Sequence, residues 1–221
     1  MASVDAQDVQ AQSAPPGLPD YVLDADAAPD YCKTRKMWDE TKKSNHTAGS
    51  LPDLVVKNWE VEASHKTDLA DWRTIDKAKY VFSVNGGPDQ TGEHMLKVGT
   101  YNALLEPSEF YCPRHSTFDD SHKTFKHMMP AFAWEVLEVY SGPPQVAFRW
   151  RHWEVMKEDY VGSNKKGDKV TIKAHGRPID IEGVAVAVAV VNDKLQLQKV
   201  EVFYDPMAMF RQMVGADEDM D

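Results

Sequence analysis

The sequence of 221 residues contains only two cysteines, Cys32 and Cys112, and no apolar run long enough for the roughly 20-residue helix that crosses a bilayer. Two cysteines are too few for a disulfide framework, so we expect a reducing compartment. The stretch Met1–Asp8 lacks the basic and apolar regions of a secretory signal. These absences predict a cytoplasmic protein without a membrane partner.

Basic residues are also scarce, because 25 Lys and Arg stand against 35 Asp and Glu, for a formal net charge of −10. Nucleic acids bind basic surfaces, so we expect none as the main partner. The Gly-rich turn Asn85–Pro88 lacks the Lys-Ser/Thr ending of a phosphate-binding loop, and no Gly-x-Ser-x-Gly elbow occurs. His122 and His127 are five residues apart and cannot share a helix face. We therefore expect neither a metal nor an organic cofactor.

The order of apolar patterns predicts one domain over residues 21–215, between a flexible N-terminal tail (1–20) and an acidic flexible tail (216–221). Helical patterns come first, strand patterns follow, and a short helix ends the series. This order favours an α+β fold with helices on one face of a curved antiparallel sheet. The expected helices are 30–45, 50–62, 89–105, 117–129 and 206–213, and the expected strands are 79–84, 132–140, 146–153, 179–191 and 195–205.

Short residue groups from about Tyr31 to Val214 carry a resemblance to a known family. They are Trp59-Glu60, His65-Lys66, Tyr101-Asn102, Phe132, Glu135–Leu137, Val139–Ser141, Ala147-Phe148, Arg151–Trp153, Gly183-Val184 and Phe203-Tyr204, with a C-terminal set at Glu201, Asp205, Met209 and Gln212-Met213. The chain thereby resembles the pathogen-related proteins of plants and their fungal relatives, within the SnoaL-like and nuclear-transport-factor-two-like superfamily. The resemblance implies a cone-shaped sheet with helices on its concave face, a pocket between them and, commonly, a dimer.

Two histidines are candidates for acid–base chemistry. His152 ends an apolar strand face, and an imidazole in a water-poor pocket can act as a general base near neutral pH. A hydrogen-bonded histidine in the core or at a subunit contact is the structural alternative. His65 lies near the C-terminal end of a helix, where the helix dipole favours the protonated imidazole. A simple charge–dipole contact would explain His65 equally well.

Glu201 is the main carboxylate candidate, because an apolar pocket would raise its pKa and let it move a proton at a carbon beside a carbonyl. Its alternative is a surface pair with Lys199. Tyr101 and Tyr204 could each donate a hydrogen bond to a substrate oxygen, or simply pack in the core. The predicted catalytic residues are His152, Glu201, His65 and Tyr101, and the predicted substrate-binding residues are Arg149, Trp150, Phe148, Trp59 and Tyr204.

Two classes of function fit these residues. The first is a cofactor-independent enzyme that uses acid–base groups on an apolar, oxygen-bearing small molecule, by isomerisation, dehydration, cyclisation or epoxide opening in secondary metabolism. The second is a non-catalytic binding or stress-response protein with the same pocket, as the superfamily resemblance also allows. Convergence of the histidines or Glu201 with a tyrosine around one cavity would favour the enzyme.

The strand over 179–191 predicts an assembly. Val184–Val190 alternate with the small residues Ala185–Ala189, so both faces are apolar and both need a cover. Helices can cover one face, and a second subunit is the natural cover for the other. We therefore expect a two-fold homodimer joined through the outer face of the sheet, to which Trp134, Trp150 and Trp153 would add apolar area. The chain's own segment 15–30 is the alternative cover.

Overall fold

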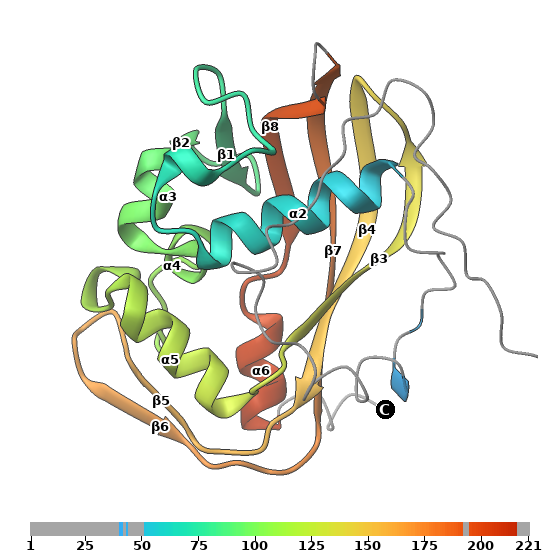
Figure 1. Ribbon diagram of the computed structural model, residues 1–221. Coiled ribbons are helices and arrows are strands. Elements are labelled where there is room, and N and C mark those ends of the chain that lie inside the picture. Colours follow the sequence, from blue (N-terminus) through green and yellow to red (C-terminus); the bar gives the residue numbers. More distant parts are fainter. Residues whose placement is uncertain (1–39, 42, 44–50, 192–194, 216–221) are drawn as a thin grey trace, which may run out of the picture.

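The computed structural model describes residues 40–41, 43, 51–191 and 195–215, and it shows a curved six-stranded sheet with helices against its concave face (Figure 1). The strand order is β2-β1-β8-β7-β4-β3. All neighbours are antiparallel except β1 and β8, which run parallel. The predicted α+β class is thus confirmed. The predicted tails fall outside the described residues, so the domain limits 21–215 stay a prediction.

The sheet consists of β1 (Val81–Val84), β2 (Gln90–Thr91), β3 (Ala133–Ser141), β4 (Gln145–Val155), β7 (Pro178–Val191) and β8 (Leu195–Tyr204). A separate hairpin of β5 (Tyr160–Ser163) and β6 (Lys169–Ile172) lies beside α5. The α-helices are α2 (Leu51–His65), α3 (Gly92–Val98), α4 (Thr100–Leu104), α5 (Phe118–Met128) and α6 (Ala208–Val214), and the short 3₁₀ turns are Leu69–Asp71 and Pro113–His115. Among the described helices, none is long and apolar enough to cross a membrane.

Local chemistry explains where the helices begin and end. The side chain of Thr117 accepts a hydrogen bond from the backbone N–H of Asp120 and caps α5, which lies within the helix predicted over 117–129. The single helix expected over 89–105 is two helices, because Gly99 adopts a φ of 89° that ends α3 and begins α4. The β5–β6 hairpin was not predicted. The helix expected over 30–45 lies outside the described residues except at 40, 41 and 43.

Small residues on the inner face of β7 make room for large rings from the neighbouring strands. Ala185, Ala187 and Ala189 are buried there. A Cβ atom on Gly183 would lie 2.4 Å from Cζ2 of Trp150 and 2.6 Å from the carbonyl oxygen of Phe203. At Gly183, the lack of a side chain on β7 therefore leaves the room that the Trp150 ring occupies on the concave side.

The outer face of the sheet is only partly covered. Tyr140, Val184 and Phe203 remain 52%, 37% and 40% exposed. Trp134 and Trp150, expected on this face, instead pack with the inner core, because they alternate with the outward-facing Glu135 and Arg151 across paired strands. The expectation that the two tryptophans enlarge the outer apolar face is therefore wrong. The alternative cover, segment 15–30, lies outside the described residues.

We expect the homodimer to use this exposed outer patch, since burial of Val184 and Phe203 would remove apolar surface from water. Light scattering should report a dimer mass at micromolar protein. Phe203→Glu should shift that mass toward the monomer, whereas Val161→Glu, an exposed position on β5, should leave it unchanged. A concentration-independent monomer mass for the unmodified chain would contradict the homodimer.

Replacement of Gly183 by alanine should destabilise the fold, because the added methyl group meets both a tryptophan ring and a backbone carbonyl. We expect a loss of about 1–3 kcal/mol in the free energy of unfolding, as for other overpacked cores. Gly142→Ala is the matched control, since a Cβ there meets nothing within 4 Å. Urea denaturation of both variants measures the difference, and equal midpoints would refute this packing argument.

Candidate active site

Five aromatic rings form a continuous row across the concave side of the molecule. Ring centroids are 6.3 Å apart for His65 and His122, 5.4 Å for His122 and Tyr101, 6.4 Å for Tyr101 and Phe132, and 4.1 Å for Phe132 and His152. The row draws on α2, α5, α4, the segment before β3, and β4. The structure thus brings together three of the four residues predicted as catalytic: His65, Tyr101 and His152.

Two charged side chains, Glu60 of α2 and Lys126 of α5, are close enough to act electrostatically on each other, and their charges also act on rings of this row. Oε1 of Glu60 accepts a hydrogen bond from Oγ of Ser64 at 3.2 Å, and Nζ of Lys126 donates to the carbonyl oxygen of Ala131 at 3.1 Å. We refer to Glu60, His65, Tyr101, His122, Lys126 and His152 as the inner cluster.

Burial dominates the electrostatics of the charged pair. It raises the pKa of Glu60, and the positive charge of Lys126 and the Ser64 hydrogen bond only partly offset the rise. Burial likewise lowers the pKa of Lys126, against the opposing influence of Glu60 and Glu154. A carboxyl group with a raised pKa can give or take a proton near neutral pH.

The neutral form is favoured for all three histidines of the inner cluster, because each has a lowered pKa. Burial, followed by the nearby charge of Lys126, lowers the pKa of His152 to about 3 and that of His65 to about 4. Burial also lowers the pKa of His122. The protonated His65 expected from the helix dipole is therefore not favoured, because desolvation and Lys126 outweigh that dipole.

Tyr101 supplies a hydroxyl group to the inner cluster. Its ring packs on Phe125 with centroids 4.6 Å apart. Burial and the negative charge of Glu60 raise its pKa, so the hydroxyl keeps its proton and remains a hydrogen-bond donor. Within the described part of the chain, the Tyr101 hydroxyl has no hydrogen-bond partner. Tyr101 can therefore donate to an oxygen of a ligand.

The position of Phe132 depends on Glu154. Phe132 has a φ of 29°, a left-handed conformation that costs a bulky residue on the order of 1–3 kcal/mol. The buried carboxylate of Glu154 accepts hydrogen bonds from the backbone N–H groups of Ala131 and Phe132, the latter at 2.7 Å, and from Nζ of Lys157 at 2.5 Å. These contacts stabilise the turn that presents the Phe132 ring to His152.

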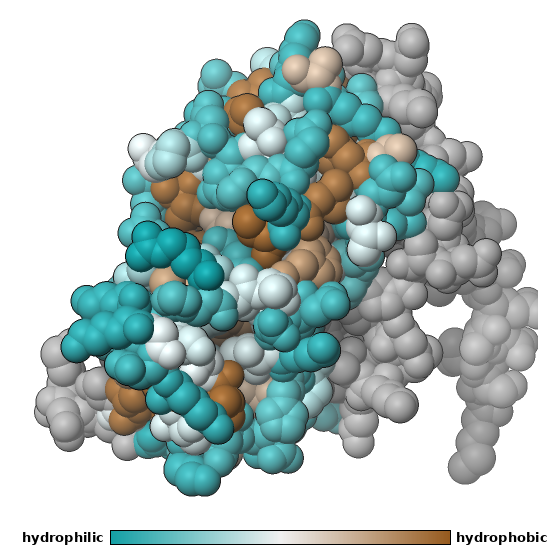
Figure 2. Space-filling view, turned by 90° about the vertical axis from the view of Figure 1, so that its left-hand side faces the viewer, coloured by the Kyte–Doolittle hydropathy of each residue, from teal (hydrophilic) through white to brown (hydrophobic). Residues whose placement is uncertain are grey.

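The inner cluster reaches solvent at one end. His65 is exposed, whereas the other members are half-buried. A separate surface hollow between α5 and β5 is lined by Lys123, Thr124, Lys126, His127 and Val161, so Lys126 also borders the outside of α5. Figure 2 views the molecule from this side and shows a mostly hydrophilic face with scattered hydrophobic residues.

Two predicted site residues lie on the opposite face of the sheet. Nζ of Lys199 is 3.6 Å from Oε2 of Glu201. This is the surface ion pair that the sequence analysis gave as the alternative to a catalytic role for Glu201. Nε of Arg149 is 3.7 Å from Oε2 of Glu182. Neither Glu201 nor Arg149 can reach the inner cluster, because the sheet separates them from it.

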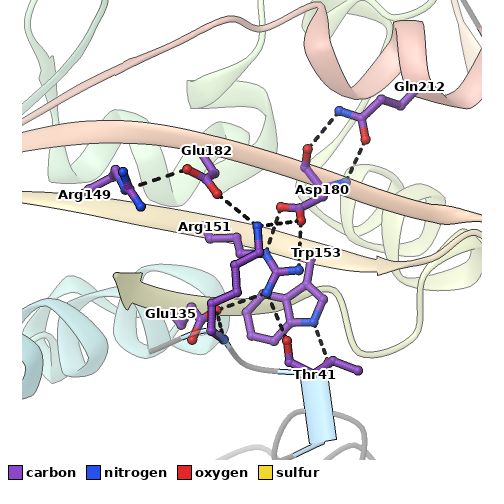
Figure 3. A network of polar contacts seen from close by, with 9 residues as sticks. Thr41, Glu135, Arg149, Arg151, Trp153, Asp180, Glu182 and Gln212 are labelled. Carbon is purple, nitrogen blue, oxygen red and sulfur yellow. Dashed lines mark hydrogen bonds and ion pairs between the residues drawn. The ribbon is translucent and has the colours of Figure 1, made fainter. Parts of the chain in front are cut away.

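The outer face instead carries a polar network centred on Arg151 (Figure 3). The guanidinium group contacts Asp180 through two nitrogens at 2.8 Å and Glu135 at 3.2 Å, and it lies 4.3 Å from the ring centroid of Trp153. It also donates to the carbonyl oxygen of Thr41 at 3.1 Å. The network attaches residues 41 and 43 to the sheet, and it is a structural feature rather than part of the inner cluster.

The remaining predicted binding residues are part of the core. Nε1 of Trp59 donates to the hydroxyl of Tyr80 at 2.7 Å, and the hydroxyl of Tyr204 donates to the carbonyl oxygen of Leu104 at 2.8 Å. Phe148 and Trp150 are buried on β4, where Trp150 packs on Tyr204. These four residues shape the concave interior. Nε1 of Trp150 is buried and lacks a hydrogen-bond partner among the described residues.

Sequence reasoning missed Glu60 and Lys126 and considered His122 only as a metal ligand. The sequence does contain a pattern that points to His122 and Lys126. The two are four residues apart and share the apolar face of α5 with Phe118 and Phe125. Two polar side chains on an apolar helix face need a partner or a function. No group of three His, Cys, Asp or Glu side chains suited to a metal ion occurs in the described residues.

Among proteins of known sequence, the chain is similar to the pathogen-related protein of barley, Hordeum vulgare. The two are 32% identical over 190 residues, which cover 81% of this chain and 76% of the barley protein. No protein-family profile matches the chain.

Three solved structures are loosely similar. IdmH of Streptomyces antibioticus, provisionally assigned as a polyketide cyclase, has a TM-score of 0.46 at 12% identity and covers 75% of this chain and 99% of its own. AclR of Streptomyces galilaeus, provisionally assigned as a hydroxylase, has a TM-score of 0.42 at 10% identity. The match covers 74% of this chain and 94% of AclR. A provisionally assigned SnoaL-like polyketide cyclase of Jannaschia has a TM-score of 0.42 at 11% identity. The match covers 78% of this chain and 98% of the cyclase. Residue roles do not transfer at such low identity.

The pKa of His152 predicts a specific pH dependence of stability. An unfolded histidine has a pKa of about 6.5, so between that value and a pKa of about 3 the unfolded chain binds a proton that the folded chain does not. The free energy of unfolding should therefore fall as pH falls through this window, by up to about 1.4 kcal/mol per pH unit for this residue.

Urea denaturation from pH 7 to pH 4 tests this dependence in His152→Asn. In this variant, the free energy of unfolding should depend less steeply on pH, because the difference in bound protons between the unfolded and folded chains is smaller by about one. His94→Asn on the exposed side of α3 is the control and should keep the slope of the unmodified protein. An unchanged slope in His152→Asn would show that His152 is not buried in its neutral form.

Proposed function

We propose that this chain, which belongs to the pathogen-related protein family, is a cofactor-independent enzyme that performs acid–base chemistry on an apolar, oxygen-bearing small molecule of secondary metabolism. One observation carries the proposal: His65, Tyr101 and His152 converge with Glu60 and Lys126 on the concave side. A protein that needed only an apolar pocket would have no reason to bury so many titratable groups together.

Glu60 is the proposed proton-transfer group. Its carboxylate would take a proton from a carbon beside a carbonyl group, and the electron pair of the broken C–H bond would form an enolate. The hydroxyl of Tyr101 would donate a hydrogen bond to the enolate oxygen, and the charge of Lys126 would stabilise it. If the enolate is conjugated with a second double bond, the proton on Glu60 would return to the far carbon and the double bond would shift, which isomerises the substrate. If a hydroxyl group is on the next carbon, the enolate electron pair would form a C=C bond as the C–O bond breaks, and Glu60 would protonate the departing oxygen to release water.

The histidines have a different proposed role. With lowered pKa values, His65 and His152 are neutral near pH 7, so each can accept or donate a hydrogen bond without adding a charge that would compete with Lys126. Nδ1 of His152 is buried and lacks a partner in the described structure, so it is available to a ligand or a bound water. We assign these imidazoles to orientation of the substrate.

A non-catalytic binding or stress-response protein is the second candidate. It is favoured by the name of the barley relative, which refers to pathogens and to no reaction. The same inner cluster would then hold a small molecule without converting it. The two candidates differ in whether Glu60 moves a proton.

Proton exchange distinguishes the two candidates. A β,γ-unsaturated cyclic ketone incubated with the protein in deuterium oxide should exchange its activated C–H proton, as followed by proton NMR. Glu60→Gln should lower the exchange rate by about 100- to 10,000-fold, the usual contribution of a general acid–base residue. Tyr101→Phe should also lower it, since the oxyanion donor is lost.

Glu201→Gln is the matched control, because it makes the same chemical change on the outer face of the sheet. It should leave the exchange rate unchanged. Ketones that bind without any exchange above the rate in buffer would contradict the enzyme and favour the binding protein.

A further inference from the structure

The surface hollow between α5 and β5 plays no part in the proposed function. It has a volume of about 550 Å³ and is lined by Lys123, Thr124, Lys126, His127 and Val161. Small-molecule sites in proteins generally have volumes of roughly 300–1,000 Å³. The hollow is open to solvent, because Lys123, His127 and Val161 are exposed. It is therefore large enough for a small molecule, and the chemistry of its lining decides which kind.

The two walls of the hollow are held in place by the core beneath them. Phe125 of α5 and Tyr160 of β5 are buried, and their ring centroids are 6.2 Å apart. At the surface, Oγ1 of Thr124 donates a long hydrogen bond of 3.4 Å to the carbonyl oxygen of Val161. The spacing of the walls thus depends on buried rings, so substitution of the exposed lining residues should leave the hollow intact.

Two basic side chains on the exposed side of α5 border the hollow. Lys123 and His127 are four residues apart, which places them one helical turn from each other. In the described part of the chain, no ion pair joins either of them to a carboxylate. Lys126 also lines the hollow, but its ammonium group is held at the carbonyl oxygen of Ala131. Lys123 and His127 are therefore the two basic groups that an incoming anion can reach.

The carboxylates near these two residues are engaged elsewhere, and none lines the hollow among the described residues. The charge of His127 acts on Asp159, but Oδ2 of Asp159 accepts from Nζ of Lys173 at 2.7 Å and its Oδ1 accepts from the backbone N–H of Ala174 at 2.9 Å. Oδ2 of Asp120 accepts from the hydroxyl of Thr117 at 2.7 Å. The fold therefore leaves the positive charge at this surface without a matching anion, although the whole chain carries a formal charge of −10.

The opposite wall of the hollow supplies an apolar surface and a further cation. Val161 is 42% exposed, so a ligand can still cover it. The register pairs Val161 with Thr171 and Ser163 with Lys169, and residues two apart on a strand share a face. The exposed Lys169 therefore lies on the same face of the hairpin as Val161. Cations beside an apolar side chain suit a ligand that combines an anionic group with an apolar body.

We propose that the hollow between α5 and β5 binds a phosphate monoester, whose phosphate contacts Nζ of Lys123 and the imidazole of His127 while its apolar body lies against Val161. A phosphate monoester carries a charge of about −1.5 to −2 near pH 7 and has three acceptor oxygens, which match two basic groups one turn apart. The Thr124 hydroxyl can donate to the third oxygen. This site is separate from the inner cluster and goes beyond the proposed function.

Three probes separate the parts of this ligand. Phenyl phosphate, inorganic phosphate and benzoate are titrated into the full chain near pH 7 and followed by proton–nitrogen correlation NMR. Benzoate keeps the ring but has a single negative charge, and inorganic phosphate lacks the ring. Phenyl phosphate should bind at least about threefold more tightly than either. Its binding should shift the backbone amide signals of Thr124 and Val161, which locates the site.

Two variants test the two contacts. Lys123→Ala should weaken phenyl phosphate binding by about fivefold, the upper range of an exposed ion pair. Val161→Thr keeps the shape of the side chain but makes it more polar, so it should weaken phenyl phosphate and leave inorganic phosphate within about twofold. Lys97→Ala, at an exposed position of α3, is the matched control and should change no affinity.

The absence of saturable shifts at Thr124 and Val161 with all three probes at millimolar concentration would overturn this proposal. Equal weakening in Lys97→Ala and Lys123→Ala would also overturn it, because anions would then be attracted by surface lysines in general. Equal affinity for benzoate would refute the preference for phosphate, and equal affinity for inorganic phosphate would refute the apolar contact. None of these results depends on ketone exchange, so this proposal and the proposed function stand or fall separately.

Discussion

The hydrogen bonds from Ala131 and Phe132 to the carboxylate of Glu154 are the interaction on which the concave site depends. They hold the chain in a left-handed conformation between the end of α5 and the start of β3. That conformation places the Phe132 ring between Tyr101 and His152, and it places the Ala131 carbonyl at the ammonium of Lys126. A relaxed backbone at Phe132 would separate the helices' polar groups from those of the sheet.

Burial sets the charge state of the site. Desolvation is the largest influence on Glu60, Lys126 and each of the three histidines of the inner cluster. The result is a group of neutral imidazoles around one lysine, although the chain as a whole carries a formal charge of −10. The overall charge is therefore a poor guide to the ligand, because electrostatic interactions in a half-buried site are local and less screened than those at the surface.

The two faces of the sheet have separate roles. Inward-facing positions of β4 carry Phe148, Trp150 and His152, whereas outward-facing Arg149 and Arg151 form ion pairs with acidic residues of β3 and β7. Because side chains alternate along a strand, an inward-facing imidazole and an outward-facing structural arginine can be neighbours in sequence and lie on opposite sides of the sheet. Glu201 lies on the outer side for the same reason, next to the buried Val200 and Val202.

The sequence by itself determined the fold class, the main strands, the position of α5 and the candidates His65, Tyr101 and His152, because these depend on local periodicity and on residue chemistry. Only the tertiary structure decided which of the candidates meet. Glu60 and Lys126 are 66 positions apart and come together only because α2 and α5 lie on the same face of the sheet. Glu201 and Arg149 have suitable chemistry, yet the register of β8 and β4 turns them away. Alternation along one strand is readable from sequence, but which face becomes the concave one depends on how the whole sheet curves around its helices.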